Sequence, residues 1–215
     1  MSAVLPRPGA ALPPPLPGFE HVRRLWNARH GFFAARILPG EYYVTRGEEG
    51  ISTTLGSCIS ACIRDSEKGI GGMNHFMLPA GSGDPGAYKA AGLGAATRYG
   101  NYAMEHLINE IMKNGGRREN LEVKVFGGGR ILEKMTDVGL RNIAFVRDYL
   151  AAEGLAVVAE DLGDIFPRQV IYFPASGRAK VKRLRSLHNN LIADVEMHYG
   201  ESLAEKPVSG DIELF

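Results

Sequence analysis

Two side chains with complementary chemistry, Cys58 and His75, lie close together in the segment STTLGSCISACIRDSEKGIGGMNHFMLP. A cysteine beside a histidine can lose its proton and become a thiolate, which is the nucleophilic form of the side chain. Residues 59–64 alternate like a β-strand, DSEKG has turn composition, and residues 70–78 read as a returning strand. The segment therefore predicts a hairpin that carries a thiol and an imidazole.

The register of this hairpin decides whether the two groups meet. A turn centred between Ser66 and Glu67 pairs residues whose numbers sum to 133, so that Cys58 faces His75. Directly opposed residues of an antiparallel pair have Cβ atoms about 4.5–5.5 Å apart. An odd-length loop or a bulge puts them on opposite faces. The alternative to a nucleophile is that Cys58 is a small buried hydrophobe and His75 is a core histidine.

The motifs around these two residues carry a family resemblance. LGSC before a strand and the histidine of GGMNHFMLP resemble the chemoreceptor glutamine deamidase family, CheD. The similarity covers roughly residues 36–185 and continues through ILPGEYYVT (37–45), RYGNYAMEHLINEIMKNG (98–115), KVFGGGRIL (124–132), GLRN (139–142), VVAEDLGD (157–164) and FPASGRAKVKRL (173–184).

The resemblance implies a fold, an activity and partners. The implied fold is α+β, a mixed β-sandwich flanked by helices in α/β/β/α layers, shared with bacterial toxin deamidases. The implied activity is conversion of selected receptor glutamines to glutamates by a cysteine-dependent protein-glutamine glutaminase. Expected partners are the cytoplasmic domain of methyl-accepting chemotaxis receptors and a CheC-type phosphatase. The alternative is a non-catalytic chemotaxis adaptor that binds those partners.

Amide hydrolysis assigns a role to each group. Cys58 attacks the glutamine carboxamide as a thiolate, and His75 passes the thiol proton to the departing ammonia. Water then hydrolyses the thioester. Backbone N–H groups around Gly56, Ser57 and Cys58 are the expected oxyanion donors. This chemistry requires no metal or organic cofactor.

A third group is expected to orient the imidazole. In the family, a threonine six residues before the cysteine has this role, and Ser52 stands at that position here. If Ile51 and Leu55 point inward, Thr53 shares their face and Ser52 lies on the other. We expect Ser52 to orient His75, with Thr53 as the runner-up.

Other chemistries fit the same residues less well. Cys58, Cys62 and His75 would give zinc only three ligands. A thioester captured by an amine would instead make the protein a transglutaminase.

Composition excludes several classes of protein. A net charge of +1 over 215 residues argues against a nucleic-acid-binding surface. No apolar run reaches the ~20 residues of a membrane span, so no membrane insertion is expected. The N-terminus is not expected to be a signal peptide, because prolines interrupt each apolar stretch. Cys58 and Cys62 are expected to lie too far apart to form a disulfide. Unpaired thiols are typical of proteins in the reducing cytoplasm.

The chain is expected to have four parts. These are a Pro-rich mobile arm (1–18), a basic helical extension (19–35), the deamidase domain (36–185), and a C-terminal helix and tail (186–215). Helices are predicted at 95–114 and 142–152, with a flap over the nucleophile at 80–94. Three glycines at 127–129 are expected to pack closely near the active site. The apolar face predicted for the last helix consists of Leu187, Leu191, Val195 and Tyr199.

Overall fold

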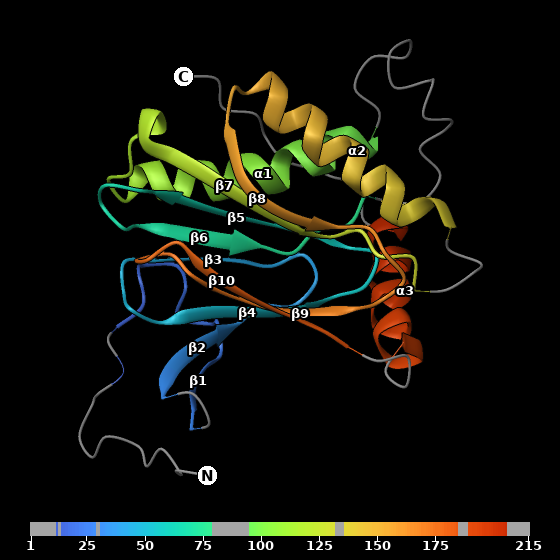
Figure 1. Ribbon diagram of the computed structural model, residues 1–215, viewed down its shortest axis with the longest axis horizontal. Helices are drawn as coiled ribbons and strands as arrows, with labels where there is room; N and C mark the ends of the chain where they lie inside the picture. Colours follow the sequence, from blue (N-terminus) through green and yellow to red (C-terminus); the bar gives the residue numbers. More distant parts are fainter. Residues whose placement is uncertain are drawn as a thin grey trace.

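Two five-stranded β-sheets and three α-helices form the protein (Figure 1). The structure is a computed structural model that describes residues 12, 14–28, 31–78, 95–131, 136–184 and 189–205. The expected flap at 80–94 and most of the Pro-rich arm therefore lie outside the described residues. No helix in the described part of the chain is long and apolar enough to cross a membrane.

The first sheet has the strand order β1-β2-β4-β9-β10. Its strands are β1 (Arg24–Asn27), β2 (Phe32–Arg36), β4 (Gly50–Leu55), β9 (Arg168–Phe173) and β10 (Arg178–Arg183). Strands β9 and β10 form a hairpin, with its turn at residues 174–177. β2 pairs with β4 in parallel, because β3 between them in the chain belongs to the other sheet.

The second sheet has the order β3-β6-β5-β7-β8. Its strands are β3 (Tyr42–Thr45), β6 (Gly71–Asn74), β5 (Ile59–Asp65), β7 (Leu121–Gly127) and β8 (Ala156–Leu162). β5 lies in the middle and is buried along almost its whole length. The chain crosses from β4 in one sheet to β5 in the other through residues 56–58, so the turn that holds Cys58 lies where the two sheets connect.

Helices α1 (Ala95–Lys113) and α2 (Thr136–Ala152) both cover the second sheet (Figure 1). α1 buries the stripe Met104, Leu107, Ile108 and Ile111 against it. Helix α3 (Asn189–Glu205) does not cover the outer face of the first sheet but stands at one end of both sheets. Among the described residues the layers are therefore α/β/β, and the fourth layer of the expected α/β/β/α arrangement is missing.

The prediction of a helix within residues 19–35 is wrong. This segment contains the antiparallel strands β1 and β2, which pair Trp26 with Phe33 and bring their rings to 4.9 Å. Gly31 adopts a positive φ of 69° in the turn between the strands. A stretch this short is a marginal helix by itself, and pairing with β4 through β2 decides its structure.

The hairpin register is shifted by two residues from the prediction. Arg64 pairs with Gly71, Cys62 pairs with Met73, and Ile59 bridges Phe76, so paired numbers sum to 135. Cys58 is therefore the diagonal neighbour of His75 rather than its direct partner. Because the shift is even, both side chains remain on one face, and diagonal pairs stay within reach of long side chains.

Candidate active site

The turn Gly56–Ser57–Cys58 has every carbonyl tied to the protein behind it. Gly129 donates its N–H to the Gly56 carbonyl at 2.7 Å, and Gly128 donates to the Cys58 carbonyl at 2.8 Å. The Asn142 side chain donates to the Ser57 carbonyl at 2.9 Å. With the carbonyls held on one side, the three N–H groups of the turn point together to the other. This is the arrangement of an anion-binding nest.

The glycines at 127–129 make this contact possible, which confirms the close packing expected of them. A Cβ atom at Gly127 would lie 2.0 Å from the Cys58 carbonyl oxygen. Gly127 and Gly128 also have φ values of 118° and 67°, which side chains disfavour.

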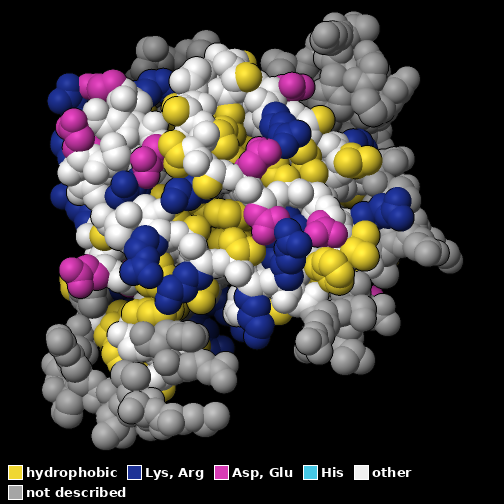
Figure 2. All heavy atoms as spheres, viewed as in Figure 1, with side chains coloured by type: hydrophobic (Ala, Val, Ile, Leu, Met, Phe, Trp, Pro, Cys, Tyr) yellow, Lys and Arg dark blue, Asp and Glu magenta, His cyan; other side chains and the backbone are white. Residues whose placement is uncertain are grey.

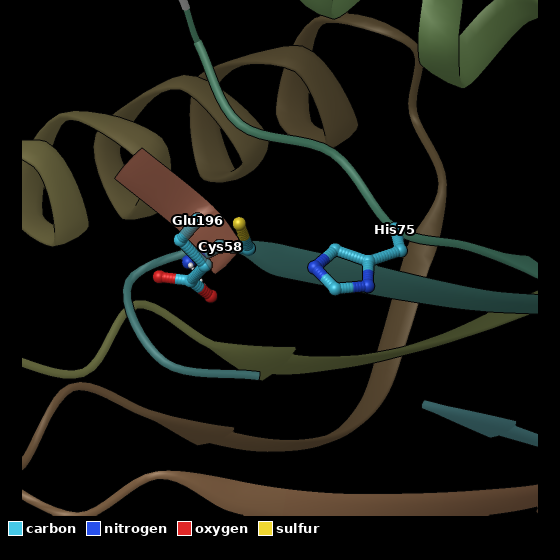
Figure 3. A group of neighbouring side chains, drawn as sticks. All are labelled: Cys58, His75 and Glu196. Carbon is cyan, nitrogen blue, oxygen red and sulfur yellow. Dashed lines mark hydrogen bonds between the residues drawn. The ribbon is translucent and has the colours of Figure 1, made fainter. Parts of the chain in front are cut away.

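The main chain of His75 is held by the 38–41 turn rather than by β5. Its N–H donates to the Glu41 carbonyl at 2.9 Å, and its carbonyl accepts from Gly40 at 2.8 Å. Ala61 in turn donates to the Asn74 side-chain oxygen at 2.8 Å in place of a main-chain partner. The ladder between β5 and β6 is thus interrupted beside His75, and the imidazole is aimed at Cys58 (Figure 3).

Thr53 determines which nitrogen of His75 carries the proton. The Thr53 hydroxyl donates its one hydrogen to the Ile37 carbonyl at 2.9 Å. It must therefore accept a hydrogen from His75 Nδ1, 2.7 Å away. This leaves Nε2 unprotonated, buried and without a hydrogen-bond partner. Nε2, the nitrogen farther from the main chain, points toward Cys58 (Figure 3).

Three side chains from distant parts of the chain meet in this site. One ligand-type atom each of Cys58, His75 and Glu196 lies within 4.8 Å of the other two. All three side chains are buried, Glu196 with 1% of its surface exposed. Glu196 comes from α3 and reaches the turn that Cys58 closes (Figure 3).

The Glu196 carboxylate occupies the nest. Its Oε1 accepts the N–H groups of Gly56 at 2.7 Å and Cys58 at 3.3 Å. Its Oε2 accepts the Ser57 N–H at 2.7 Å and the Ser57 hydroxyl at 2.6 Å. The four donors hold the carboxylate in the position where backbone N–H groups would stabilise an oxyanion.

Both members of the thiol–imidazole pair are neutral in this environment. Burial raises the pKa of the Cys58 thiol well above its usual value, and the nearby Glu196 carboxylate raises it further. Burial lowers the pKa of His75 to about 4, although Glu196 opposes that change. At neutral pH the pair is therefore thiol and imidazole rather than thiolate and imidazolium.

The structure brings the sequence-predicted residues together with one correction. Cys58 and His75 converge, and Gly56 and Ser57 supply N–H donors, as expected. Ser52, however, is half-buried and donates to the Ala35 carbonyl at 3.3 Å, while Thr53 contacts His75. The inward direction of Thr53 was predicted correctly. The error was to choose the orienting residue by its spacing of six from Cys58, since the imidazole meets the inward face of β4, which carries Thr53.

Cys62 takes no part in the site. It is a free, buried cysteine on β5, outside the group formed by Cys58, His75 and Glu196. The zinc set of Cys58, Cys62 and His75 is therefore wrong. A metal would have to use Glu196, but each of its oxygens already accepts two hydrogen bonds, which fills both lone pairs.

Sequence reasoning missed two residues of the site. Glu196 is 138 residues from Cys58 in the chain. Asn142 is fully buried and joins the turn to the segment that follows β6, where it accepts the Leu78 N–H at 2.9 Å. An asparagine on the buried face of a predicted helix was a signal for Asn142, because a buried amide needs partners.

This geometry places the chain in the class of α+β proteins able to support acyl transfer through a cysteine and a histidine. A family model described as CheD chemotactic sensory transduction matches residues 77–183. The chain is 55% identical over 207 residues to the probable chemoreceptor glutamine deamidase CheD of Halorhodospira halophila, covering 96% of each chain. It is 51% identical over 205 residues to the protein of the same name from Hahella chejuensis, covering 94% of this chain and 96% of that one. The chain belongs to the CheD family.

Proposed function

We propose that this protein is a chemoreceptor glutamine deamidase, a cysteine-dependent protein-glutamine glutaminase. The names of its relatives state that activity for them. The observation that carries the proposal here is the unprotonated Nε2 of His75, buried beside Cys58 and fixed by the bond from Nδ1 to Thr53.

The proposed reaction is hydrolysis of a side-chain amide through a thioester. His75 Nε2 takes the proton of Cys58 as the sulfur attacks the carboxamide carbon of glutamine. The N–H groups of Gly56, Ser57 and Cys58 stabilise the developing oxyanion. The imidazolium then gives its proton to the leaving ammonia, and water, deprotonated by His75, hydrolyses the thioester to glutamate.

Cys58→Ala tests the reaction against the adaptor alternative. A receptor cytoplasmic domain incubated with the wild type should release ammonia and gain the mass of one amide-to-acid conversion at each modified glutamine. Cys58→Ala should do neither while still binding. Cys62→Ala is the matched control, because Cys62 is also buried on the same segment but outside the site, and it should keep most of the activity. An inactive wild type that binds receptor would favour the adaptor.

Basic side chains offer a place for the receptor to contact the protein. Figure 2 shows Lys and Arg side chains gathered over β9 and β10. Arg178, Lys182 and Arg183 of β10 are exposed. We propose that acidic positions of the receptor meet this strand, as part of a complex formed in the cytoplasm.

The remaining expectations belong to the same proposal. A CheC-type phosphatase is a second proposed partner, and kinship with the toxin deamidase fold follows from the sequence resemblance. The proposed domain organisation keeps a deamidase domain at 36–185, with the β1–β2 hairpin in place of a helical extension and α3 within the C-terminal part.

A further inference from the structure

Helix α3 fills the site with the chemical group that the proposed reaction produces. The product of glutamine deamidation is a glutamate side chain, and Glu196 is a glutamate side chain held by the oxyanion donors. Its Oε1 lies where the single carboxamide oxygen of a bound glutamine would receive the same N–H bonds from Gly56 and Cys58. Because Glu196 is buried with Cys58 and His75, no substrate amide has access to the sulfur while α3 is in place.

The rest of α3 is held by contacts of limited extent. Tyr199 packs on Gly40, where an added Cβ atom would lie 2.7 Å from its hydroxyl, and it shares a hydrogen bond with Tyr99. Gly200 lies against Met77, and Ala193 is fully buried. Leu191 and Val195 remain 69% and 52% exposed.

A cavity of about 260 Å³ continues beneath α3. Its walls come from the end of β2, from β4, from the end of β10 and from α3 itself. They include Ile37, Leu38, Thr53, Leu184, Ile192 and Glu196. The helix therefore spans a groove with a mostly apolar lining rather than packing into a filled core, which is consistent with a removable element.

We propose that α3 is an intramolecular product analogue that closes the active site, and that the groove beneath it receives the glutamine-bearing helix of the substrate when α3 leaves. This inference rests on the proposed function. It adds to that function a helical conformation for the substrate and a control of the substrate's access to Cys58. A helix delivers Glu196 to Cys58, so the site accepts a side chain of this length from a helical backbone.

A catalytic role for Glu196 does not fit its contacts. No hydrogen bond joins Glu196 to His75, whose Nδ1 is taken by Thr53. A carboxylate beside the sulfur raises the pKa of Cys58 and so opposes formation of the nucleophile. The carboxylate also accepts the hydrogen bonds of the N–H groups that an oxyanion would need. A purely structural role, as a cap on the 56–58 turn, is the alternative that experiments must separate.

The decisive experiment makes α3 a substrate. Glu196→Gln puts a carboxamide in the position that the carboxylate holds. Cys58 should attack it, ammonia should leave, and water should hydrolyse the thioester, which restores Glu196. In water enriched in the heavy oxygen isotope, peptide mass mapping should find glutamate at this position with one heavy oxygen. The same substitution combined with Cys58→Ala should keep glutamine.

Glu201→Gln is the matched control on the same helix. Glu201 is exposed to solvent, so the amide introduced there has no access to Cys58 and should persist. If the amide of Glu196→Gln persists in a variant that deamidates receptor, the product-analogue proposal is overturned and the proposed function stands. If that amide is converted while no receptor is modified, α3 is a substrate analogue but receptor is not the substrate. If neither is modified, the proposed function fails as well.

Receptor deamidation tests the closure independently. Glu196→Ala and Tyr199→Ala should each raise the initial rate at low receptor concentration, by about tenfold if the closed form dominates. Tyr199→Ala weakens α3 without changing a hydrogen bond to the 56–58 turn, and Glu201→Ala should change nothing. A fall in the rate for Glu196→Ala, with or without a lower melting temperature, would instead make Glu196 a structural or catalytic group and overturn the proposal.

Discussion

At the scale of single residues, the tautomer of His75 is the feature on which the proposed chemistry depends. A histidine acts as a base toward Cys58 only if Nε2 is unprotonated. Thr53 enforces this because its own hydrogen is used by Ile37, which makes its oxygen an obligatory acceptor. A main-chain carbonyl at the end of β2 thus determines, through the Thr53 hydroxyl, which nitrogen of His75 is protonated. Thr53 and His75 are 22 residues apart in the chain.

Thr53→Val should therefore impair turnover with little effect on the fold. Valine has the shape of threonine but cannot accept from Nδ1, so the imidazole loses its fixed tautomer and orientation. We expect kcat to fall by roughly ten- to a hundredfold, within the contribution of general base catalysis. Receptor deamidation followed by ammonia release measures this.

Two further substitutions separate this role from packing. Thr53→Ser keeps the hydroxyl and should recover most of the rate. Ser52→Ala should leave the rate unchanged, because the Ser52 hydroxyl donates to the Ala35 carbonyl rather than contacting His75. A Ser52→Ala defect as large as that of Thr53→Val would refute the assignment of Thr53.

The residues at Cys58 and His75 could be found from sequence because hairpin geometry is local. Alternation fixed the faces of β5, and an error of two in the register kept the two groups on one face. Ser52 was preferred to Thr53 by counting from the cysteine, although the strand pattern had already placed Thr53 inward. Glu196 could not be found in this way, since no local pattern relates α3 to a turn 138 residues earlier.

At the scale of elements, the loop after β7 supports the loop after β4. Gly127, Gly128 and Gly129 lie against the back of the 56–58 turn, where the N–H groups of the last two hold its carbonyls. The sequence indicated close packing here because three consecutive glycines allow another main chain to approach closely. The buried face of α3 could not be predicted from such a local pattern. Its buried face includes Glu196, whereas Leu191 and Val195 from the expected face are exposed.

Gly127→Ala should therefore disable the site as well as strain the chain. The added Cβ atom would lie 2.0 Å from the Cys58 carbonyl oxygen, so the nucleophile turn must move. We expect activity to fall by about a hundredfold, as small misplacements of reacting groups can cause. Gly154→Ala is the matched control, because Gly154 also has a positive φ of 65° but no atom near its Cβ position.

Gly154→Ala should be destabilised only by the strain of a left-handed residue, roughly 1–2 kcal/mol, and should keep its activity. Thermal melting of the two variants measures the first quantity, and receptor deamidation measures the second. Equal activity in the two variants would mean that β7 does not position Cys58.

At the scale of the whole molecule, the site is assembled where the two sheets connect, and α3 closes it from one end. Cys58 comes from the crossing between the sheets, His75 directly follows β6 of the second sheet, and Thr53 comes from β4 of the first. Helices α1 and α2 secure one face of this assembly, whereas α3 contributes mainly a carboxylate and a tyrosine. Opening therefore requires one helix to move and leaves the two sheets packed.

The reactivity of Cys58 should report this opening. Three titratable side chains affect the pKa of Cys58 or have their own pKa affected by it, namely Glu196, Tyr99 and Tyr199. The neutral His75 imidazole also lies within 4.8 Å of the site's other two side chains. With α3 in place, the thiol is inaccessible and its pKa is raised by burial and by the Glu196 charge. Removing that charge lowers the pKa, because the thiolate no longer meets a neighbouring anion. Glu196→Ala should thus be alkylated by iodoacetamide faster than the wild type, with the rate rising at a lower pH.

Cys62 provides the internal reference for that measurement. It is equally buried and its pKa is also raised by burial, but it lies outside the group that Glu196 of α3 forms with Cys58 and His75. Peptide mapping after alkylation should show modification at Cys58 in Glu196→Ala and Tyr199→Ala, with Cys62 unmodified in both. Glu196→Ala is preferred to Glu196→Gln here, because the glutamine is expected to revert during the assay. Parallel increases at Cys58 and Cys62 would indicate general unfolding, and an unchanged rate at Cys58 would show that α3 does not control access to the sulfur.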